Sequence, residues 1–452
     1  MNDHLKEFRK IVQSGTCCGC GACVALDKSG CSRMIDAMNG PIPEFDVHSA
    51  FPDWCLKICP ARGVNYPELY KKTLGHAPAS WLFGETKHAY TGYSGDPDIR
   101  KIGASGGVLT HVLCHLLETK KVDAVIAAKQ GVGNPLTARA VICSTVDEIK
   151  AAAQSVYIPV SMLDILPKLD ASKRYAMTCL PETSAALRVL QQEDYSPAKL
   201  IRYIVGPYTG TALSPAAINC YLRSNGIKKS DPVVRLQWRA GDWPGYLQID
   251  TQSGRCIKSP KVYYNYLIPF FVTQTSLQSM DFANEFADLA VGDAWNPKFE
   301  AEAKKGAGGQ SVVAVRTEEM SSIVEEMRTE GLLSLTPIDP LKAGDMHGHM
   351  LDFKKRGGYL RNRWRKLTGR RAPDYGYRPA QVPLLRICVE IVISTLFAVG
   401  HLNVSRWLVS CLPEQWIGPL FDNMRKKWKS FSRPTKRKGL GDFRVVVRRQ
   451  WS

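Results

Sequence analysis

The chain has 452 residues and a formal net charge of +18, and 44% of its residues are hydrophobic and 23% charged. This composition is typical of a soluble globular protein and excludes a wholly disordered chain. The charge is uneven, because residues 354–452 carry 23 basic and 5 acidic side chains whereas residues 1–353 carry 37 of each. We therefore expect a neutral body of about two domains, followed by a basic C-terminal extension.

The first 60 residues contain half of the cysteines. Residues 1–16 lack the apolar segment of a secretory signal, which predicts a cytoplasmic protein. Fourteen cysteines in such a chain favour thiol chemistry or metal ligation over disulfides. Seven of them lie between residues 17 and 59, in a segment rich in Gly and Pro. This segment is expected to be a loop-dominated module held together by something other than a hydrophobic core.

Cys17, Cys20 and Cys23 form a C-x-x-C-x-x-C motif, and Cys59 precedes a proline further along. Three closely spaced thiolates and a remote Cys-Pro are typical of a [4Fe–4S] cluster, so these four cysteines are the predicted ligands. Zinc binding and free thiols are the alternatives. Cys55 and then Cys31 are the alternatives to Cys59 as fourth ligand.

From about residue 88 to residue 317 buried strands alternate with amphipathic helices. Thr145 and Glu148 form a capping box at the start of one helix. Strands are expected at 122–129, 138–143, 176–179, 200–205, 288–294 and 310–316, helices at 103–118, 146–154, 184–192 and 216–225, and antiparallel strands within 238–249 and 255–260. The alternation predicts an α/β core with a mixed, mostly parallel sheet.

Six segments in fixed order carry a resemblance to a known family. They are CCGCGAC at 17–23, GYSGDPDIRKIGASGG at 92–107, AAAQSVYIP at 151–159, LPETSAALRVL at 180–190, FADLAVGDAW at 286–295 and GGQSVVAVRT at 308–317. By these segments the chain resembles the coenzyme F-420 hydrogenase/dehydrogenase beta-subunit family, and within it the bacterial members found with surface-polysaccharide genes. The resemblance implies an iron–sulfur flavoprotein that binds FAD or FMN. The expected domains are a ferredoxin-like cluster module (1–75), a flavin-binding α/β domain (76–350) and a helical basic extension (351–452).

The resemblance also implies where a flavin would bind. Ser105, Gly106 and Gly107 end a Gly/Ser-rich loop at a helix N-terminus, which suits a phosphate. An ordinary helix start with close packing is the alternative there. Three further candidates, Gln154, Ser155 and Tyr157, match a family stretch that lines the flavin site, although Val156 stands where the family often has a basic residue. Asp293 is the last candidate, with a strand-end turn as the alternative.

The family typically holds a second cluster with four more cysteines. Alignment by flanking motifs places Glu182, Thr209, Ser276 and Ser279 at those positions. Oxygen-bearing side chains are poor ligands for iron in a sulfide cluster. We therefore expect one [4Fe–4S] cluster per chain and not two.

Residues 354–452 allow three interpretations. Basic residues around Trp364 resemble a nucleic-acid surface, but no recognition motif accompanies them, so nucleic acid is not expected as a partner. The apolar stretch 382–400, broken by Arg386 and Glu390 and followed by Trp and Lys/Arg, favours an interfacial helix on an anionic membrane. A helical pair packed on the body or a partner, with a solvated basic tail, is the third interpretation.

Two functional hypotheses result. In the first, the protein is a flavin-dependent oxidoreductase that takes electrons from a donor protein or reduced coenzyme and acts near the inner membrane face, in surface-polysaccharide assembly. In the second, it is a non-catalytic accessory protein at the membrane surface, built on a decayed redox scaffold. Neither hypothesis assigns a catalytic residue.

Overall fold

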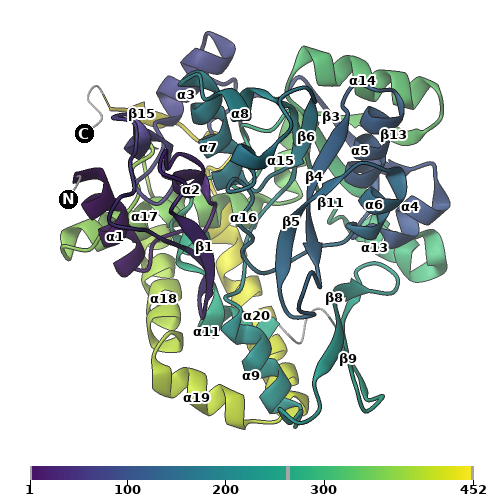
Figure 1. The fold of residues 1–452 in the computed structure, drawn as a ribbon. Helices are drawn as coiled ribbons and strands as arrows, with labels where there is room; N and C mark the ends of the chain where they lie inside the picture. Colours follow the sequence, from purple (N-terminus) through teal and green to yellow (C-terminus); the bar gives the residue numbers. More distant parts are fainter. Residues whose placement is uncertain (1–2, 261–264, 449–452) are drawn as a thin grey trace.

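The computed structural model of the chain describes residues 3–260 and 265–448. Within them a central sheet of eight strands runs in the order β13-β3-β12-β11-β7-β6-β4-β5 (Figure 1). The strands are β3 (His88–Ser94), β4 (Ala124–Gln130), β5 (Ala138–Cys143), β6 (Tyr175–Thr178), β7 (Ile201–Pro207), β11 (Leu289–Asp293), β12 (Ser311–Val315) and β13 (Leu333–Ile338). With helices on both faces, the fold is α/β, as the sequence predicts.

The sheet is mixed, but its parallel part is smaller than expected. Only the central pairs β4–β6, β6–β7 and β7–β11 are parallel. The other four pairings among the described strands are antiparallel. A short loop, residues 131–137, joins β4 to β5 and is closed by a hydrogen bond from Gly131 N–H to the Thr137 carbonyl; a loop this short joins antiparallel strands, because parallel strands need a longer crossover. A buried apolar run in the sequence does not reveal the direction of its strand. The sequence therefore predicted more parallel pairings than the sheet has.

Two hydrophobic clusters cover the two faces of the sheet. One contains apolar side chains of α4 (Pro97–Ile102), α5 (Val108–Glu118), α6 (Val146–Ala151) and α14 (Glu318–Thr329). The other contains those of α3 (Tyr66–Leu74), α7 (Pro181–Gln192), α8 (Ser196–Lys199) and α15 (Pro340–Asp345). The predicted capping box is present at the start of α6, with the Thr145 side chain accepting from Glu148 N–H. The helix ends three residues earlier than predicted, which leaves residues 152–160 free to form a loop.

The N-terminal module contains α1 (Asp3–Gln13), α2 (Ala22–Ala25) and the antiparallel pair β1 (Arg33–Ala37) and β2 (Gly40–Glu44). The expectation that it lacks a core was wrong. Phe8 packs on Phe45 and Phe51 with ring centroids 5.8 and 5.2 Å apart. These side chains join the same buried cluster as α7, so the module is packed onto the sheet domain.

A second sheet consists of β8 (Val233–Ala240), β9 (Tyr246–Thr251) and β10 (Cys256–Pro260), all antiparallel as expected. It packs with α9 (Ala216–Ser224). After this sheet come the short helices α11 (Ile268–Phe271), α12 (Gln274–Gln278) and α13 (Pro297–Glu302). Single helical turns elsewhere in the chain are Cys55–Ile58, Leu166–Lys168, Asn265–Leu267 and Ala303–Ala307.

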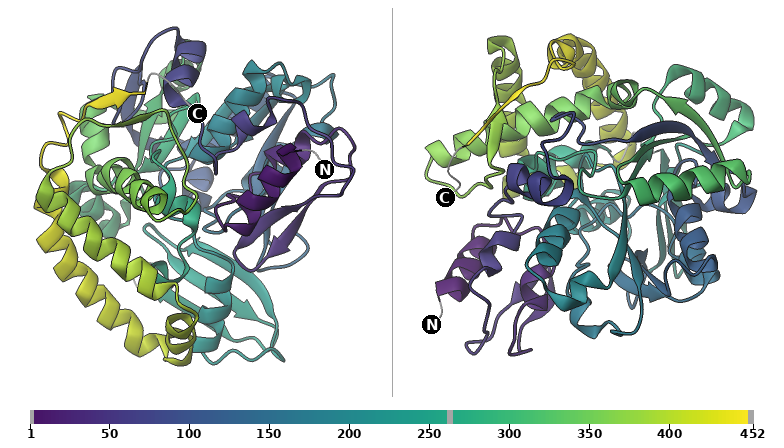
Figure 2. Two further views of the ribbon diagram at one scale, coloured as in Figure 1. Left: turned by 90° about the vertical axis from the view of Figure 1, so that its left-hand side faces the viewer. Right: turned by 90° about the horizontal axis from the view of Figure 1, so that it is seen from above.

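The predicted C-terminal extension begins inside a continuous helical run. α16 (Gly348–Asp352), a π-helical turn (Phe353–Gly357) and α17 (Gly358–Leu367) follow one another without a break. Beyond them lie α18 (Leu384–Gly400), α19 (Asn403–Cys411), α20 (Glu414–Arg437), β14 (Tyr377–Pro379) and β15 (Val445–Val447). Figure 2 shows the last three helices beside the sheet domain. Residues 449–452 of the extension and 1–2 of the module lie outside the described residues.

The start of this extension is not a solvated tail, because Lys354, Lys355 and Arg356 are at most 2% exposed. Arg361 is also buried, so it does not contribute to an exposed basic patch. None of the described helices is by itself long and apolar enough to cross a bilayer, whereas α18 and α19, bent by 75° at their junction, reach that composition as a pair.

Candidate cofactor site

A cavity of about 290 Å³ opens at the carboxyl ends of the four parallel strands. Ala128 at the end of β4, Thr178 of β6, Pro207 of β7 and Gly292 of β11 all line it. In open α/β sheets ligands bind outside the carboxyl ends of the strands, where the backbone groups that end each strand are available. The fold therefore marks this cavity as the candidate cofactor site.

Six of the seven residues predicted from the resemblance line this one cavity. They are Ser105, Gly107, Gln154, Ser155, Tyr157 and Asp293. They come from three separate loops that lie up to 188 residues apart in sequence. The structure thus brings them together, and their role as flavin contacts stays a prediction. Gly106 does not line the cavity.

The loop before α5 meets the cavity through Ser105 and Gly107. Gly107 has φ +77°, and no side chain caps the helix start that follows it. The amide of Gly106 donates to the Ser311 hydroxyl at 2.9 Å, and a Cβ on Gly106 would lie 2.5 Å from the Gly92 carbonyl oxygen. Gly106 is therefore required for close packing, and its amide is already satisfied, whereas the uncapped start of α5 remains available to an anionic group.

The loop 152–160, which follows the end of α6, forms another wall of the cavity. Gln154 adopts φ +105°, a conformation that costs a non-glycine residue about 1–3 kcal/mol and that gathers at ligand sites. Tyr157 packs edge-on against Trp238 of β8, with ring centroids 5.7 Å apart. The wall is thus fixed by the second sheet.

Asp293 contacts protein groups that the sequence did not reveal. Arg239 of β8 forms a bidentate ion pair with it, with a shortest separation of 2.9 Å, and the Trp243 indole donates to it at 2.9 Å. Arg239 is 5% exposed and lines the cavity. Burying two charged side chains costs free energy, and the bidentate pair together with the Trp243 hydrogen bond offsets that cost here. No local motif marks Arg239, because its partner is 54 residues away in sequence.

Tyr208 is the second cavity residue that sequence analysis missed. Its hydroxyl is buried and has no hydrogen-bond partner among the described residues. Burial raises the pKa of Tyr208, so the hydroxyl keeps its proton and remains a donor. A Cβ on Gly292 would lie 2.3 Å from the Tyr208 ring, so the ring is held against the strand end. An unsatisfied buried hydroxyl lining a cavity is the arrangement expected where a ligand supplies the missing acceptor.

The predicted cluster ligands lie close together in the N-terminal module. Burial, and then the neighbouring thiols Cys17, Cys20 and Cys59, raises the pKa of Cys23 well above its usual value. Burial likewise raises the pKa of Cys17 to about 12 and that of Cys59 to about 11. Thiols grouped this closely become thiolates when iron supplies the compensating positive charge.

The alternative fourth ligands differ in position. Cys55 is buried and lies close enough to Cys59 for that thiol to raise its pKa, whereas Cys31 is exposed. Gly19 and Gly21 have φ of +71° and +85°, and Gly19 N–H donates to Cys17 Sγ at 3.4 Å. Among the described residues no group of His, Cys, Asp and Glu is arranged to hold a single metal ion. The donor set of closely spaced thiols and nearby amides fits a sulfide cluster.

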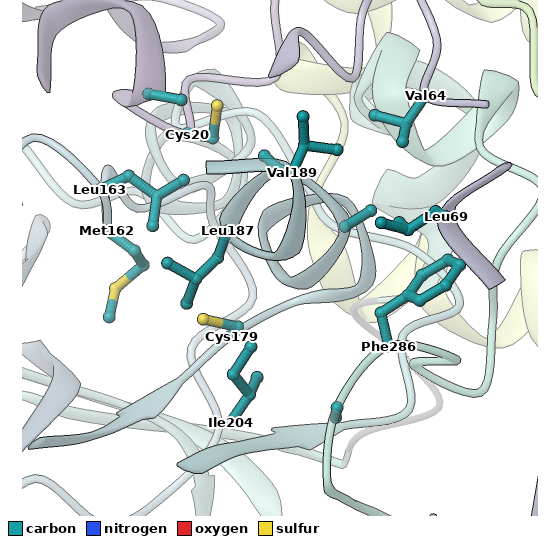
Figure 3. Packing of buried hydrophobic residues seen from close by; sticks show 14 of the residues in the cluster. Cys20, Val64, Leu69, Met162, Leu163, Cys179, Leu187, Val189, Ile204 and Phe286 are labelled. Atoms are coloured by element: carbon teal, nitrogen blue, oxygen red, sulfur yellow. The ribbon is translucent and has the colours of Figure 1, made fainter. Parts of the chain in front are cut away.

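The cysteine loop packs next to Met162 and Leu163, as the position of Cys20 in Figure 3 shows. Leu163 N–H donates to the Cys20 carbonyl at 2.8 Å, and the neighbouring Met162 lines the cavity. A Cβ on Gly21 would lie 2.4 Å from the Ser161 hydroxyl, so no side chain separates the loop from this wall. Cys179, which also lines the cavity, is near enough to Cys20 for that thiol to contribute to its raised pKa, after burial.

The four positions aligned with a second cluster now belong to a polar, buried region. Lys354 Nζ donates to the Ser276 carbonyl at 3.0 Å. Burial lowers the pKa of Lys354 to about 8, and the nearby Glu182 opposes this shift. Ser279 hydrogen-bonds with the backbone of Asp281, and Thr209 N–H donates to the Phe282 carbonyl. An ammonium group therefore lies beside Ser276 and Glu182, two of the four positions.

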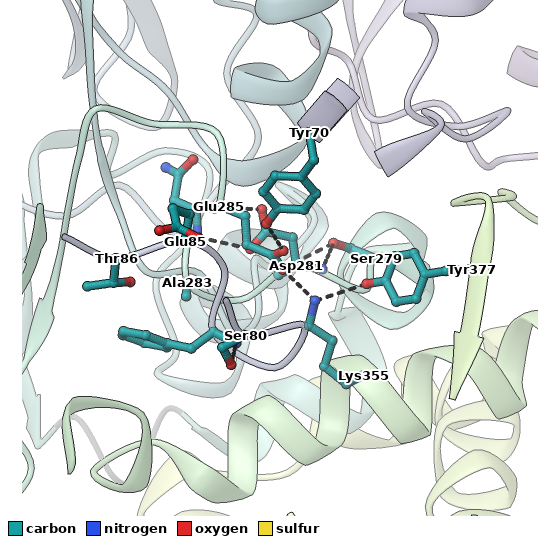
Figure 4. Close-up of polar contacts among 12 residues, drawn as sticks. Tyr70, Ser80, Glu85, Thr86, Ser279, Asp281, Ala283, Glu285, Lys355 and Tyr377 are labelled. Carbon is teal, nitrogen blue, oxygen red and sulfur yellow. Dashed lines mark hydrogen bonds and ion pairs between the residues drawn. The ribbon is translucent and has the colours of Figure 1, made fainter. Parts of the chain in front are cut away.

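Next to it lies a second buried lysine in an ion-pair network (Figure 4). Lys355 forms a fully buried ion pair with Glu285, donates to the Tyr377 hydroxyl at 2.9 Å, and shares Glu285 with the Tyr70 hydroxyl. Although burial opposes the charge, Glu285 raises the pKa of Lys355. Burial, and then Glu285, raises the pKa of Asp281 to about 7.

The site thus combines a cavity at the parallel strand ends of an α/β domain with a neighbouring loop of clustered thiols. Residues 89–167 match the family described as coenzyme F420 hydrogenase/dehydrogenase, beta subunit N-term, and residues 172–341 match the family that describes the C terminus of the same beta subunit. Together these segments cover more than half of the chain. The chain belongs to the coenzyme F420 hydrogenase/dehydrogenase beta-subunit family.

The chain is also similar to individual proteins. The coenzyme F420 hydrogenase subunit beta of Methanothermobacter thermautotrophicus is 22% identical over 58% of this chain and 89% of its own length. The coenzyme F420-dependent sulfite reductase of Methanocaldococcus jannaschii is 23% identical over 74% of this chain, which spans only half of that protein. A chain of the F420-reducing [NiFe] hydrogenase complex of Methanosarcina barkeri superposes with a TM-score of 0.49 and 17% identity, covering 63% of this chain and 95% of that one.

Proposed function

We propose that the protein is an iron–sulfur flavoprotein oxidoreductase with one [4Fe–4S] cluster and one FAD or FMN. Cys17, Cys20, Cys23 and Cys59 would hold the cluster, and the cavity at the strand ends would hold the flavin. The observation that carries the proposal is the direct contact between the Cys20 backbone and Met162, a residue of the cavity wall whose N–H donates to the Cys20 carbonyl at 3.3 Å. This contact supports electron transfer between the two groups without a second cluster.

The residues of the cavity have separable roles in this proposal. The uncapped start of α5, after Gly107, would bind flavin phosphate through backbone amides. Tyr208 would donate its buried hydroxyl to a polar edge of the flavin. The Arg239–Asp293 pair fixes the wall opposite the loop and keeps a guanidinium next to the cavity. When bound, flavin exchanges electron pairs or single electrons with its partners, and the cluster exchanges single electrons.

The direct test is spectroscopic. Protein purified without oxygen is expected to show oxidised flavin absorption and about four irons per chain, the content of one cubane cluster. Cys20→Ser should lose the iron and keep the flavin, because Cys20 lies outside the cavity lining. Cys31→Ser, a matched change of an exposed cysteine in the same module, should keep both. About eight irons, or iron retained in Cys20→Ser, would contradict the proposal.

A second candidate function is a non-catalytic accessory role. The observation that favours it is the buried ammonium of Lys354 beside Ser276 and Glu182, where the family has cluster cysteines. A folded protein that carries neither flavin nor iron after anaerobic purification would support this candidate against the first. Stoichiometric flavin and iron in the same anaerobically purified protein would support the oxidoreductase.

The setting of the reaction is also a proposal. We place the protein on the cytoplasmic side, where thiols stay reduced, with a redox protein or a reduced coenzyme as electron donor. The bacterial members that it resembles suggest surface-polysaccharide assembly as the process. Loss of the polysaccharide in a deletion strain, restored by the wild-type gene and not by Cys20→Ser, is the expected result.

A further inference from the structure

The side of α18 that packs on the body contains charged residues as well as the apolar Val389 and Ile393. Its charged side chains, Arg386 and Glu390, are fully buried, and Arg386 pairs with Asp352 at 2.7 Å and with Glu390 at 2.8 Å. Ile391 and Val392, on its outer side, are each 52% exposed. A helix packed on a protein in water normally places its apolar side inward. Here a second apolar side is presented outward, in addition to the one that packs on the body.

The exposed apolar surface continues past the end of α18. Val404 and Trp407 of α19 are 66% and 57% exposed, and Trp416 at the start of α20 is 73% exposed. With Ile391, Val392 and Leu396 these residues form what we call the apolar face. Figure 1 shows α18 and α19 at one edge of the molecule, away from the central sheet. Large exposed apolar side chains gathered on neighbouring helices are typical of an interaction site.

The exposed charged side chains of α18 to α20 all have one sign. The acidic residues of α18 to α20 are Glu390, Glu414 and Asp422, and all three are buried. The exposed charged side chains of α20 are basic, including Lys426 and Lys427. An anionic surface is therefore complementary to this region. A second copy related by a two-fold axis would instead bring like charges together.

We infer that the apolar face inserts into the interface of an anionic lipid bilayer, with α18 and α19 lying in the membrane plane. An interfacial helix buries its apolar side about 5–10 Å into the headgroup boundary, and Trp is favoured at that depth. Each basic residue near the surface adds about 1 kcal/mol. The Arg386–Glu390–Asp352 cluster anchors α18 to the body from the other side, so the redox domain is held at the surface.

Flotation with lipid vesicles tests the inference. The full-length protein is expected to bind vesicles of equal parts phosphatidylcholine and phosphatidylglycerol at least about tenfold more tightly than pure phosphatidylcholine, and to lose this preference in high salt. Ile391→Ser/Val392→Ser/Leu396→Ser should abolish binding. The matched variant Val47→Ser/Val234→Ser/Leu341→Ser, at exposed apolar sites outside the apolar face, should bind as the wild type does.

A second readout reports insertion directly. Brominated acyl chains should quench Trp fluorescence in the wild type, and most of this quenching should disappear in Trp407→Phe/Trp416→Phe. The inference is overturned if the wild-type protein does not float with anionic vesicles, or if the apolar triple variant floats equally well. It is also overturned if the wild type is a dimer that the same triple variant converts to a monomer, since the apolar face would then be a contact between copies.

Discussion

At the scale of single residues, replacing the buried hydroxyl of Tyr208 should have opposite effects on the stability of the protein and on its affinity for flavin. Tyr208→Phe removes a donor that lacks a partner in the protein, so the cofactor-free protein should become more stable by about 1 kcal/mol. If the hydroxyl donates to flavin, the same change should weaken flavin retention about tenfold. Thermal unfolding and flavin titration measure the two quantities.

The matched control is Tyr203→Phe. The Tyr203 hydroxyl donates to Glu319 at 2.6 Å, away from the cavity. This change should lower stability slightly and leave flavin affinity unchanged. Equal flavin affinity in wild type and Tyr208→Phe would remove Tyr208 from the binding site.

Asp281 gives a pH dependence with a defined sign. Burial and Glu285 raise its pKa to about 7 from a usual value of 3.8, so the folded protein holds a proton there that the unfolded chain has released. This contribution to the free energy of unfolding is present below pH 4 and falls as pH rises toward 7, by up to about 4 kcal/mol. Asp281→Asn cannot titrate. The stability of wild type minus that of Asp281→Asn should therefore decrease from pH 4 to pH 7, and a constant difference would contradict the assignment.

At the scale of elements, the π-helical turn Phe353–Gly357 places two adjacent lysines in opposite surroundings. Lys355→Met leaves Glu285 buried without its ion-pair partner, which should cost about 3–5 kcal/mol. Lys354→Met removes an ammonium group whose charge burial disfavours, so its cost should be much smaller. Urea unfolding of the two variants provides the comparison, because both remove the same group from neighbouring positions. Equal losses would show that the pair with Glu285 is not the cause.

The elements also show what sequence can predict. Local signals were reliable: the capping box at Thr145 and most strand positions are where the pattern places them. Long-range pairings were not. Arg239 reaches Asp293 from a separate sheet, and Lys355 meets Glu285 across 70 residues, so neither partner could be identified from its neighbours in sequence. Lysines and arginines are usually exposed, so nothing in the sequence marked residues 354–356 as buried.

At the scale of the whole molecule, the cysteine module is held by a segment from the other end of the chain. Arg371 pairs with Glu7, and Tyr375 packs edge-on against Tyr66 with ring centroids 5.2 Å apart. Gly63 lies so close to this segment that a Cβ would be 1.9 Å from the Asp374 carbonyl oxygen. The module is therefore completed only when residues 371–375 are in place.

Two glycine substitutions test this contact. Gly63→Ala should displace the segment and lower the iron content of purified protein. Gly75→Ala is the control, because Gly75 also has positive φ (+82°, against +109° at Gly63) but a Cβ there meets nothing within 4 Å. Its cost should be limited to about 1 kcal/mol of backbone strain, with iron unchanged. Equal iron in both variants would show that the segment is dispensable for the module.

The contact between residues 371–375 and the cysteine module can form only late in the synthesis of the chain. Cys59 leaves the ribosome more than 300 residues before Tyr375 does. At about 5–20 residues per second, roughly 16–63 s pass between the synthesis of Cys59 and that of Tyr375. During this interval a nascent chain presents an open set of thiols, exposed to oxidation and to stray metal ions. If these cysteines hold the proposed cluster, iron and sulfide delivered in this interval would meet an open module, whereas later delivery would meet a module already closed by residues 371–375.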